Sequence, residues 1–392
     1  MANGCHCGLD SRPEKNDLGI ICSETLCNAA AVYTTNQVKG APILVTRKNM
    51  EATKGKARAV IVNSKNANTC NADGEEKAWN MCELTAQQLK ITPEEVIVAS
   101  TGVIGQTLPI EPIAAHIQEL VSSMSPQRHG EAAAAIMTTD TVKKEAAVSF
   151  LLDGKTCHLG GMAKGSGMIH PNMATTLNFI TTDAAISSEM LQKALSETVK
   201  VTYNCLSVDG DTSTNDMVCV LANGLAGNAE ITAENEDFRM FQKALYLVLL
   251  HLTKMLAKDG EGATKLIECT CSGAPDLDTA ITAAKSVVSS SLVKSAMFGA
   301  DANCGRILCA LGYAGVPLDV SKIDVSLASG QGRVQVCGSG NGLAFSEEDA
   351  ARVLSADEIQ ILVDLHQGSV SAQAWGCDLT YDYVKINADY RS

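Results

Sequence analysis

The stretch KGSGMIHPNMATTLNFITTDA covers residues 164–184, near the middle of the chain. Its first half is rich in glycine and ends with a proline and an alanine before two threonines. Its second half alternates like a β-strand. A small residue and a bent backbone favour attack of the Thr175 hydroxyl on the preceding carbonyl. Cleavage there would leave an N-terminal threonine whose own α-amine serves as its base. On composition alone, the start of a strand explains the segment better.

The composition is that of an ordinary globular chain. Of its 392 residues, 46% are hydrophobic, 19% charged and 4% aromatic, so the core must be mostly aliphatic. The net charge is −13 and lysine and arginine do not cluster, which argues against a nucleic-acid partner. No stretch approaches the roughly 18 apolar residues of a membrane span, and the N-terminus lacks the apolar core of a signal peptide. We therefore expect a cytoplasmic protein without a membrane partner.

Fifteen cysteines are many for a chain without an export signal. We expect reduced thiols that pack as small hydrophobes rather than disulfides. The clusters CHC (5–7) and CTC (269–271) lack the spacing of zinc sites, so no metal is expected. Phosphate-loop, dinucleotide, HExxH and G-x-S-x-G motifs are absent. Their absence strengthens the case for chemistry at Thr175.

Predicted helices and strands alternate along the chain. Apolar runs predict strands at 59–62, 95–100 and 176–184. Helical spacing predicts helices at 75–89, 110–124, 187–203 and 238–260, the last with Gly260 as its left-handed cap. Residues 323–345 are typical of short strands with glycine turns. The mixture predicts an α/β (α+β) body in which helices cover sizeable sheets.

Several segments resemble, in the expected order, the ornithine acetyltransferase (glutamate N-acetyltransferase) family of arginine biosynthesis. Besides the central stretch they are STGVIGQTLPIEPI, AAAAIMTTDTVKKEA, SVDGDTSTNDMV, DGEGATKLIE, SSLVKSAMFGADANCGRILCALGYAG and YVKINADYRS. The resemblance runs from about Ala31 to Ser392. So many ordered blocks are hard to obtain by chance, and the chain is identified as a member of this family.

The resemblance implies that the chain cleaves itself between Ala174 and Thr175. The products would be an α chain of residues 1–174 and a β chain of residues 175–392 that begins with the nucleophile, and both would build one catalytic body. The implied fold is a four-layer αββα sandwich of the ornithine-acetyltransferase and aminopeptidase type, with a smaller additional region. The implied assembly is a heterotetramer of two α and two β chains.

The implied reaction moves acetyl from N-acetylornithine to glutamate through an acetyl-Thr175 ester, giving ornithine and N-acetylglutamate by a ping-pong mechanism. Thr101 and Gly102 match the family's oxyanion-hole pair. Loss of one such donor costs about 3 kcal/mol in an acyl-transfer enzyme. No bound cofactor is expected. Some members of the family also use acetyl-CoA as a co-substrate, and the sequence leaves that choice open.

Six residues match substrate-binding positions of the family: Thr138, Lys164, Thr175, Glu261, Asn387 and Ser392. Lys164 would meet a substrate carboxylate as a point charge. Glu261 follows a predicted helix C-terminus, whose partial negative charge also favours a cation, so it would meet an amino group. Without the resemblance, both would be assigned as ordinary solvated side chains.

The sequence departs from the family pattern at a few places. Ser392 ends the chain where threonine is usual, and Lys65 replaces a usual glycine. Ala302 and Cys304 stand where proline and tryptophan are usual. Residues 1–30 resemble the family poorly. None of these changes touches the cleavage segment or the oxyanion pair.

Two alternatives remain open at this point. A self-cleaving aminopeptidase or amidohydrolase of the same fold would pass the acyl group to water, whereas Glu261, Asn387 and Ser392 favour a transferase. A non-enzymatic binding protein with a degenerate site is disfavoured, because Ala174, Thr175 and the oxyanion pair are all present.

Overall fold

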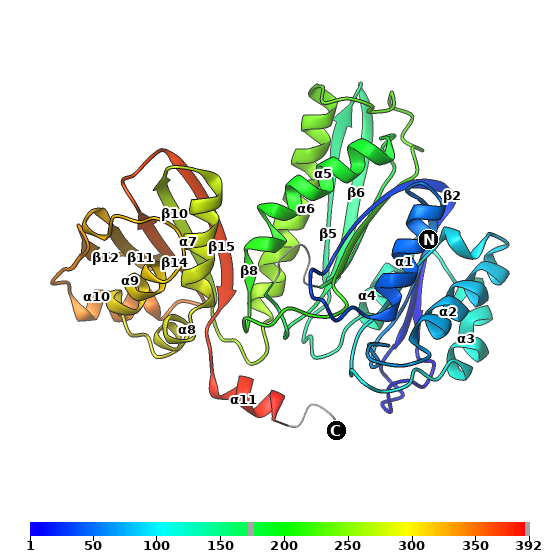
Figure 1. Cartoon of the computed structure of the whole chain (residues 1–392), viewed down its shortest axis with the longest axis horizontal. Coiled ribbons are helices and arrows are strands. Elements are labelled where there is room, and N and C mark those ends of the chain that lie inside the picture. The colour runs from blue at the N-terminus through cyan, green and yellow to red at the C-terminus, as the bar shows by residue number, and fades with distance from the viewer. Residues whose placement is uncertain (171–175, 389–392) are drawn as a thin grey trace. The chain divides into compact units, whose positions relative to one another are not determined.

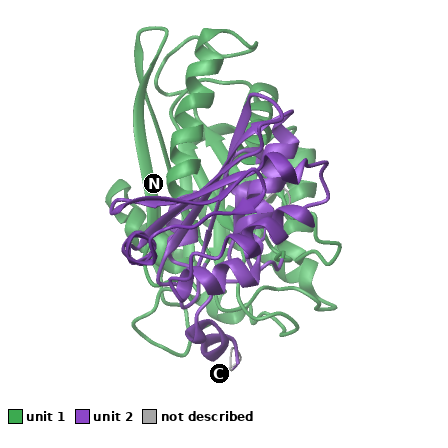
Figure 2. Ribbon diagram, turned by 90° about the vertical axis from the view of Figure 1, so that its left-hand side faces the viewer, with its two compact units in different colours: residues 1–165, 172–199, 212–252 green, residues 166–171, 200–211, 253–392 purple. Residues whose placement is uncertain are grey.

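The computed structural model describes residues 1–170 and 176–388 (Figure 1). The chain forms two compact units, coloured separately in Figure 2. Unit 1 comprises residues 1–165, 172–199 and 212–252, and unit 2 comprises residues 166–171, 200–211 and 253–392. The candidate residues Ala174, Thr175 and Ser392 lie outside the described residues.

The described part of unit 1 contains one eight-stranded sheet, in the order β4-β3-β2-β9-β7-β6-β5, with β1 paired to β2. Its strands are β1 (Ala2–Cys5), β2 (Leu18–Tyr33), β3 (Lys56–Asn63), β4 (Val96–Ser100), β5 (Lys144–Leu152), β6 (Lys155–Lys164), β7 (Leu177–Thr182) and β9 (Met217–Ala222). The predicted strands at 59–62, 95–100 and 176–184 are confirmed as β3, β4 and β7. The sequence did not predict β2 or the β5–β6 hairpin.

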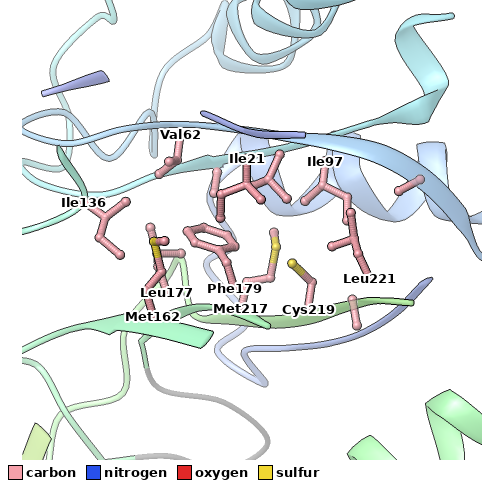
Figure 3. Packing of buried hydrophobic residues seen from close by; sticks show 14 of the residues in the cluster. Ile21, Val62, Ile97, Ile136, Met162, Leu177, Phe179, Met217, Cys219 and Leu221 are labelled. Atoms are coloured by element: carbon pink, nitrogen blue, oxygen red, sulfur yellow. The ribbon is translucent and has the colours of Figure 1, made fainter. Parts of the chain in front are cut away.

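Strand β2 connects two layers of this sheet. Its first part pairs with β3 and its second part with β9, and its register against β3 shifts between Cys22 and Cys27. Such an irregularity bends a strand and increases its twist. Figure 3 shows the result: Ile21, Val62 and Ile97 face the side chains from β6, β7 and β9 across a buried apolar core. The residues drawn from these three strands are Met162, Leu177, Phe179, Met217, Cys219 and Leu221.

Three helices cover the outer face of the first β layer. They are α1 (Ala41–Ala52), α2 (Gly74–Leu89) and α3 (Glu111–Ser122), of which α2 and α3 were predicted. Side chains alternate along a strand, so Leu18 and Ile20 of β2 point toward these helices while Ile21 points into the inner core. Leu18 and Ile20 pack in one cluster with Met81 and Ile113.

Two further helices, α5 (Ser188–Lys200) and α6 (Glu236–Lys258), form the layer beside β5 and β6 (Figure 1). The rings of Phe150 in β5 and Phe241 in α6 lie 6.2 Å apart, centroid to centroid. The predicted apolar stripe of α6 is fully or almost fully buried at Phe238, Phe241, Leu245, Leu249, Leu252 and Leu256. Unit 1 therefore has the predicted αββα order of layers. The short helix α4 (His129–Ala135) packs against β1 and β2.

The cap predicted at Gly260 is wrong. Helix α6 ends at Lys258, and the glycine with positive φ is Gly262, at 68°. A Cβ on Gly262 would lie 2.6 Å from the backbone nitrogen of Tyr383. Gly262 therefore combines a left-handed backbone with a close approach to the C-terminal helix that leaves no room for a side chain.

Unit 2 is the smaller additional region. Its described strands form one sheet in the order β13-β12-β11-β14-β10-β15-β8. They are β8 (Leu206–Ser207), β10 (Leu266–Ala274), β11 (Asp324–Ser329), β12 (Gly332–Gly338), β13 (Asn341–Gly342), β14 (Glu358–Asp364) and β15 (Val370–Cys377). Its helices are α7 (Leu277–Ser289), α8 (Ser291–Phe298), α9 (Cys304–Gly312), α10 (Glu347–Leu354) and α11 (Tyr381–Asn387). Helix α7 packs against β10 and β15, and α10 against β11 and β12.

All fifteen cysteines are unpaired, and eleven of them are buried. Cys219, for example, belongs to the inner core of unit 1. Burial raises the pKa of Cys82 and of Cys205 to about 12, which keeps both thiols protonated. The eleven buried cysteines thus act as small core residues, as predicted. Among the residues that the structure describes, no helix is both long and apolar enough to span a bilayer.

Candidate active site

The ends of three neighbouring strands meet at Leu177, which follows the predicted nucleophile by two residues in the chain. Leu177, which begins β7, lies opposite Lys164 at the end of β6 and opposite Met217 at the start of β9. The Met217 backbone N–H donates a 2.9 Å hydrogen bond to the carbonyl of Thr176. Thr176 is buried and directly follows Thr175 in the chain. Thus the residue after the predicted nucleophile is fixed at this edge, whereas Thr175 lies in the undescribed segment.

The predicted oxyanion pair occupies the loop that follows β4. The Thr101 backbone N–H donates to the Asn63 carbonyl at 3.0 Å, and the Val103 N–H donates to the Lys65 carbonyl at 2.9 Å. Between them, Gly102 has a φ of 131°, and a Cβ there would overlap the carbonyl group of Lys65. Only glycine fits this backbone conformation without displacing the Lys65 segment. The geometry therefore explains why position 102 is a glycine.

Asn215 fixes the start of the loop after β4, and sequence reasoning missed it. Its side-chain Nδ2 donates to the carbonyls of Ala67 and Ser100 at 2.6 and 3.0 Å. Its Oδ1 accepts hydrogen bonds from the hydroxyls of Thr69 and Thr214, each at 2.6 Å. All four hydrogen-bonding positions of this buried amide are used. Because Ser100 directly precedes Thr101, Asn215 fixes the position at which the predicted oxyanion pair begins.

Lys164 contacts the loop after β4 directly. Its Nζ lies 3.3 Å from Oγ1 of Thr101, and the residue is only 8% exposed. The sequence alone suggested a surface lysine, and the structure instead buries it. The structure therefore brings two predicted site residues, Thr101 and Lys164, into contact.

Asp140 organises the charges around Lys164, and sequence reasoning also missed it. Its carboxylate accepts hydrogen bonds from Nζ of Lys144 at 2.7 Å and from the backbone N–H groups of Gly165 and Thr138 at 2.6 and 3.0 Å. Burial alone would raise the pKa of Asp140, but Lys164, Lys144 and these hydrogen bonds outweigh it and lower the pKa to about 2. The carboxylate therefore stays ionised and fixes the backbone of Thr138 and of the residue after Lys164.

Thr138 lies in the loop after α4. Its N–H donates to Asp140, and its carbonyl accepts a 2.8 Å hydrogen bond from Nζ of Lys15. Thr138 is thus linked to the end of β6 through Asp140. The only sequence signal for Asp140 was the repeated TTD motif at 138–140 and 181–183, which is too short to identify a site.

Glu261 and Asn387 are hydrogen-bonded partners in unit 2. Nδ2 of Asn387 donates to Oε2 of Glu261 at 2.7 Å, and the Glu261 backbone N–H donates to the Ser166 carbonyl at 2.8 Å. Glu261 is buried, and a Cβ on Gly167 would overlap its carboxylate. The sequence alone suggested a solvated loop acid. Instead, Glu261 is buried and hydrogen-bonded to Asn387, so two predicted binding residues from distant parts of the chain form one pair.

A metal centre finds no support in the residues described. No group of three or more histidine, cysteine, aspartate or glutamate side chains among residues 1–170 and 176–388 is arranged to hold an ion.

Comparison with known proteins places the chain in a family. The sequence profile of the ArgJ family matches residues 1–392. The chain belongs to the ArgJ family. It is thus an enzyme, a glutamate N-acetyltransferase of arginine biosynthesis, which confirms the family predicted from the sequence.

Individual members match over nearly their whole length. The arginine biosynthesis bifunctional protein ArgJ 1 of Clostridium acetobutylicum is 53% identical over 379 residues, or 96% of this chain and 92% of the relative. The ArgJ bifunctional protein of Caldanaerobacter subterraneus subsp. tengcongensis is 49% identical over 393 residues, or 100% and 96% of the two chains. A crystal structure of ArgJ from Bacillus halodurans is 49% identical with a TM-score of 0.50, and the match covers 53% of this chain and 96% of that chain.

Proposed function

We propose that this ArgJ chain matures by cutting itself between Ala174 and Thr175 and then transfers acetyl from N-acetylornithine to glutamate. In the cut, the Thr175 hydroxyl attacks the Ala174 carbonyl and displaces its own nitrogen, which gives an ester and a free α-amine. Water then opens the ester, leaving a carboxylate on Ala174. Each later acetyl transfer passes through an ester on the Thr175 hydroxyl.

The anchored start of β7 supports this maturation. Thr176 is held by Met217, so a cut before Thr175 would leave the second residue of the new chain attached to the sheet. The matched chain of the Bacillus halodurans structure supports it as well. That chain is little more than half as long as this one, as expected for a family member divided into two polypeptides.

The loop after β4, which contains Thr101 and Gly102, supports the acyl-transfer chemistry. Thr175 would attack the acetyl carbonyl of N-acetylornithine while its α-amine takes the hydroxyl proton. That proton then goes to the departing amine of ornithine. The negative oxygen of the tetrahedral intermediate needs fixed donors, which the pair Thr101 and Gly102 would supply. The amine of glutamate reverses these steps on the acetyl ester and leaves as N-acetylglutamate.

The charged groups suit amino-acid substrates. Lys164 presents a buried cation beside Thr101, which suits a substrate carboxylate. In unit 2, the Glu261–Asn387 pair presents a buried carboxylate, which suits a substrate ammonium group. The family resemblance assigns both groups, with Thr138 and Ser392, to substrate binding.

The observation that carries the proposal is the contact of Lys164 with Thr101 next to the glycine-dependent turn at Gly102. It joins the end of β6, which leads into the cleavage segment, to the loop predicted to hold the oxyanion. By analogy with relatives named bifunctional, we also propose acetyl-CoA as a second acetyl donor for glutamate. We further propose an assembly of two α and two β chains.

Denatured mass and an acetyl-transfer assay test the proposal together. The purified protein should give two species that meet at Ala174–Thr175, and it should form N-acetylglutamate from N-acetylornithine and glutamate. Thr175→Ala should remain a single chain without transfer activity, while Thr175→Ser should retain both reactions at reduced rates. An intact chain that is still fully active would refute the mechanism. Acetate released without N-acetylglutamate would instead indicate a hydrolase.

The same preparation tests the co-substrate and the assembly. Formation of N-acetylglutamate from acetyl-CoA in the absence of N-acetylornithine would support the second donor. A native mass of two α and two β chains would support the heterotetramer, and the mass of a single α–β pair would contradict it.

A further inference from the structure

Asp216 is a buried acid that the proposed chemistry has not used. It directly precedes β9, is only 3% exposed, and its Oδ2 has no hydrogen-bond partner in the described structure. Burial raises the pKa of Asp216 well above its ordinary value, although Ser213 and Lys164 favour the ionised form. An unpartnered buried carboxyl oxygen is costly, so its retention calls for an explanation.

A second unpartnered acceptor lies on the neighbouring strand. Asn178 of β7 is completely buried, and its Oδ1 also lacks a hydrogen-bond donor in the described structure. Its Nδ2 donates to the hydroxyl of Thr176. Two acceptors without donors therefore occur where the first residues of β7 and β9 run side by side.

Strand register places both acceptors near the residue that follows the cleavage position. Strands β7 and β9 are parallel, with Leu177 opposite Met217 and Asn178 opposite Val218. Asp216 directly precedes β9, and Thr176 directly precedes β7. The two residues therefore occupy equivalent positions on neighbouring strands. Because side chains alternate along a strand, Thr176, Asn178 and Asp216 share a parity opposite to that of the core residues Leu177 and Met217.

The missing partner must supply hydrogen-bond donors and fits best if it is positive. An ammonium group has three donors and no acceptor, which complements one carboxylate oxygen and one amide oxygen. Before cleavage, the nitrogen of Thr175 is an uncharged amide with a single hydrogen. After cleavage it is an α-amine that binds a proton near neutral pH.

We propose that Asp216, together with Asn178, is the binding site for the α-ammonium group that cleavage before Thr175 releases. This inference rests on the proposed maturation. If Asp216 holds a proton before the cut, it transfers that proton to the new amine, and the charges that result attract each other. Asp216 is thus a positioning residue, which fixes the amine that serves as the base for the Thr175 hydroxyl.

The charged surroundings of Asp216 bear on the pH dependence. Lys164 is the charged group that acts on the Asp216 carboxyl, and it is in turn balanced by Asp140, which also pairs with Lys144. An ionised Asp216 should stabilise the protonated form of the amine and raise its pKa. The acidic limb of the kcat/KM profile for N-acetylornithine reports loss of the neutral amine, so its midpoint should depend on Asp216.

Two substitutions with opposite effects test the inference on the full, matured protein. Asp216→Asn removes the charge with little change in shape, and it should lower the midpoint of the acidic limb by about one pH unit. Asn178→Asp adds a second negative charge and should raise the midpoint. Asp278→Asn is the matched control, because its side chain is 76% exposed in unit 2, and it should leave the midpoint unchanged.

Denatured mass and circular dichroism are measured on every variant, so that cleavage and folding are known separately. Folded, cleaved variants with an unshifted acidic limb would overturn the inference while leaving the proposed function intact. Folded variants that stay uncleaved would also overturn it, because the acid would then serve the cut rather than its product. A wild-type chain that is neither cleaved nor active would instead overturn the proposed function. If Asp216→Asn does not fold, the direction of the Asn178→Asp shift decides.

Discussion

The loop after β4 and the strand ends of β6, β7 and β9 are built in opposite ways. In the loop, the Asn215 amide uses all its hydrogen-bonding positions, and Gly102 fits closely against Lys65. At the strand ends, Asp216 and Asn178 keep buried oxygens without donors in the described structure, and the charge of Lys164 acts on Asp216. The Asn215 amide is thus fully hydrogen-bonded, whereas Asp216 and Asn178 each keep one acceptor oxygen without a donor among the described residues. Cleavage, on our proposal, supplies that donor.

Gly102→Ala should produce the largest change, because the loop has no room for a Cβ. We expect the rate of acetyl transfer to fall by about 100-fold or more, the size of effect seen when an oxyanion donor is lost. Gly105→Ala is the matched control: Gly105 also has a positive φ, of 79°, but no atom lies within 4 Å of its added Cβ. Equal losses in both variants would show that backbone strain, and not the close approach to Lys65, limits the loop.

Asn215→Ala should cost the most stability among neutral substitutions in this region. It leaves two carbonyls and two hydroxyls without their partner, and we expect the free energy of unfolding to fall by about 4 kcal/mol. Urea denaturation measures the change. Asn341→Ala, at an exposed residue, is the control. A loss below about 1 kcal/mol would mean that water replaces the amide, and that the loop is less tightly packed than its contacts indicate.

Asp140→Asn tests the buried charges near Lys164, at the end of β6. Lys144 and Asp140 have completely buried side chains, and removal of one partner of such a pair typically costs about 3 kcal/mol. The pKa of Asp140 is lowered in the folded state, so its contribution is present above the unfolded pKa near 4 and is lost as the pH falls toward about 2.

The pH dependence separates this charge effect from simple packing. The wild-type protein should lose about 2 kcal/mol more than Asp140→Asn between about pH 5 and pH 2, as measured by denaturation at each pH. Parallel stability curves for the two proteins would contradict the assignment of Asp140 as the counter-ion of Lys144 and Lys164.

Lys65→Gly should have the smallest effect. Lys65 has a φ of 74°, which is unfavourable for a side-chain-bearing residue, and the family resemblance implies glycine at this position. Relief of strain is partly cancelled by the greater freedom of glycine in the unfolded chain, so we expect a gain of about 0.5 kcal/mol in thermal or urea denaturation. Lys54→Gly, at an exposed residue with a φ of 56°, should behave alike. A loss of transfer activity in Lys65→Gly alone would add Lys65 to the site.

The sequence predicted the elements with strong local patterns. Strands β3, β4 and β7 and helices α2, α3, α5 and α6 follow directly from apolar runs and helical spacing. Strand β2 was not predicted because both of its faces are buried: Leu18 and Ile20 pack in one core, and Ile21 and Ala29 in the other. An irregular segment at residues 22–27 also interrupts its pairing with β3. The β5–β6 hairpin was not predicted because β5 shows only a weak alternation of apolar and polar residues. This strand contains small residues and is largely half-exposed.

The site was only partly predictable, for a physical reason. Thr101, Gly102 and Lys164 were assigned through family resemblance, and the structure shows that Lys164 and Thr101 are in contact. Asn215 acts through hydrogen bonds to residues 115 and 148 positions away, and Asp140 acts on a backbone 25 positions away. No local pattern marks such partners, because only folding brings them together.

The order of strands in the first sheet has a consequence for the life of the matured enzyme. Strands β7 and β9 follow Thr175 in the chain, yet they lie between β2 and β6, which precede it. After a cut, the two polypeptides would be held by the ladders of β2 with β9 and of β6 with β7 rather than by a covalent link. The cut would turn folding from a reaction of one molecule into one of two, so recovery after denaturation would slow with dilution. Maturation would thus be a step that the folded protein passes through once, with the uncut chain as the form best able to refold.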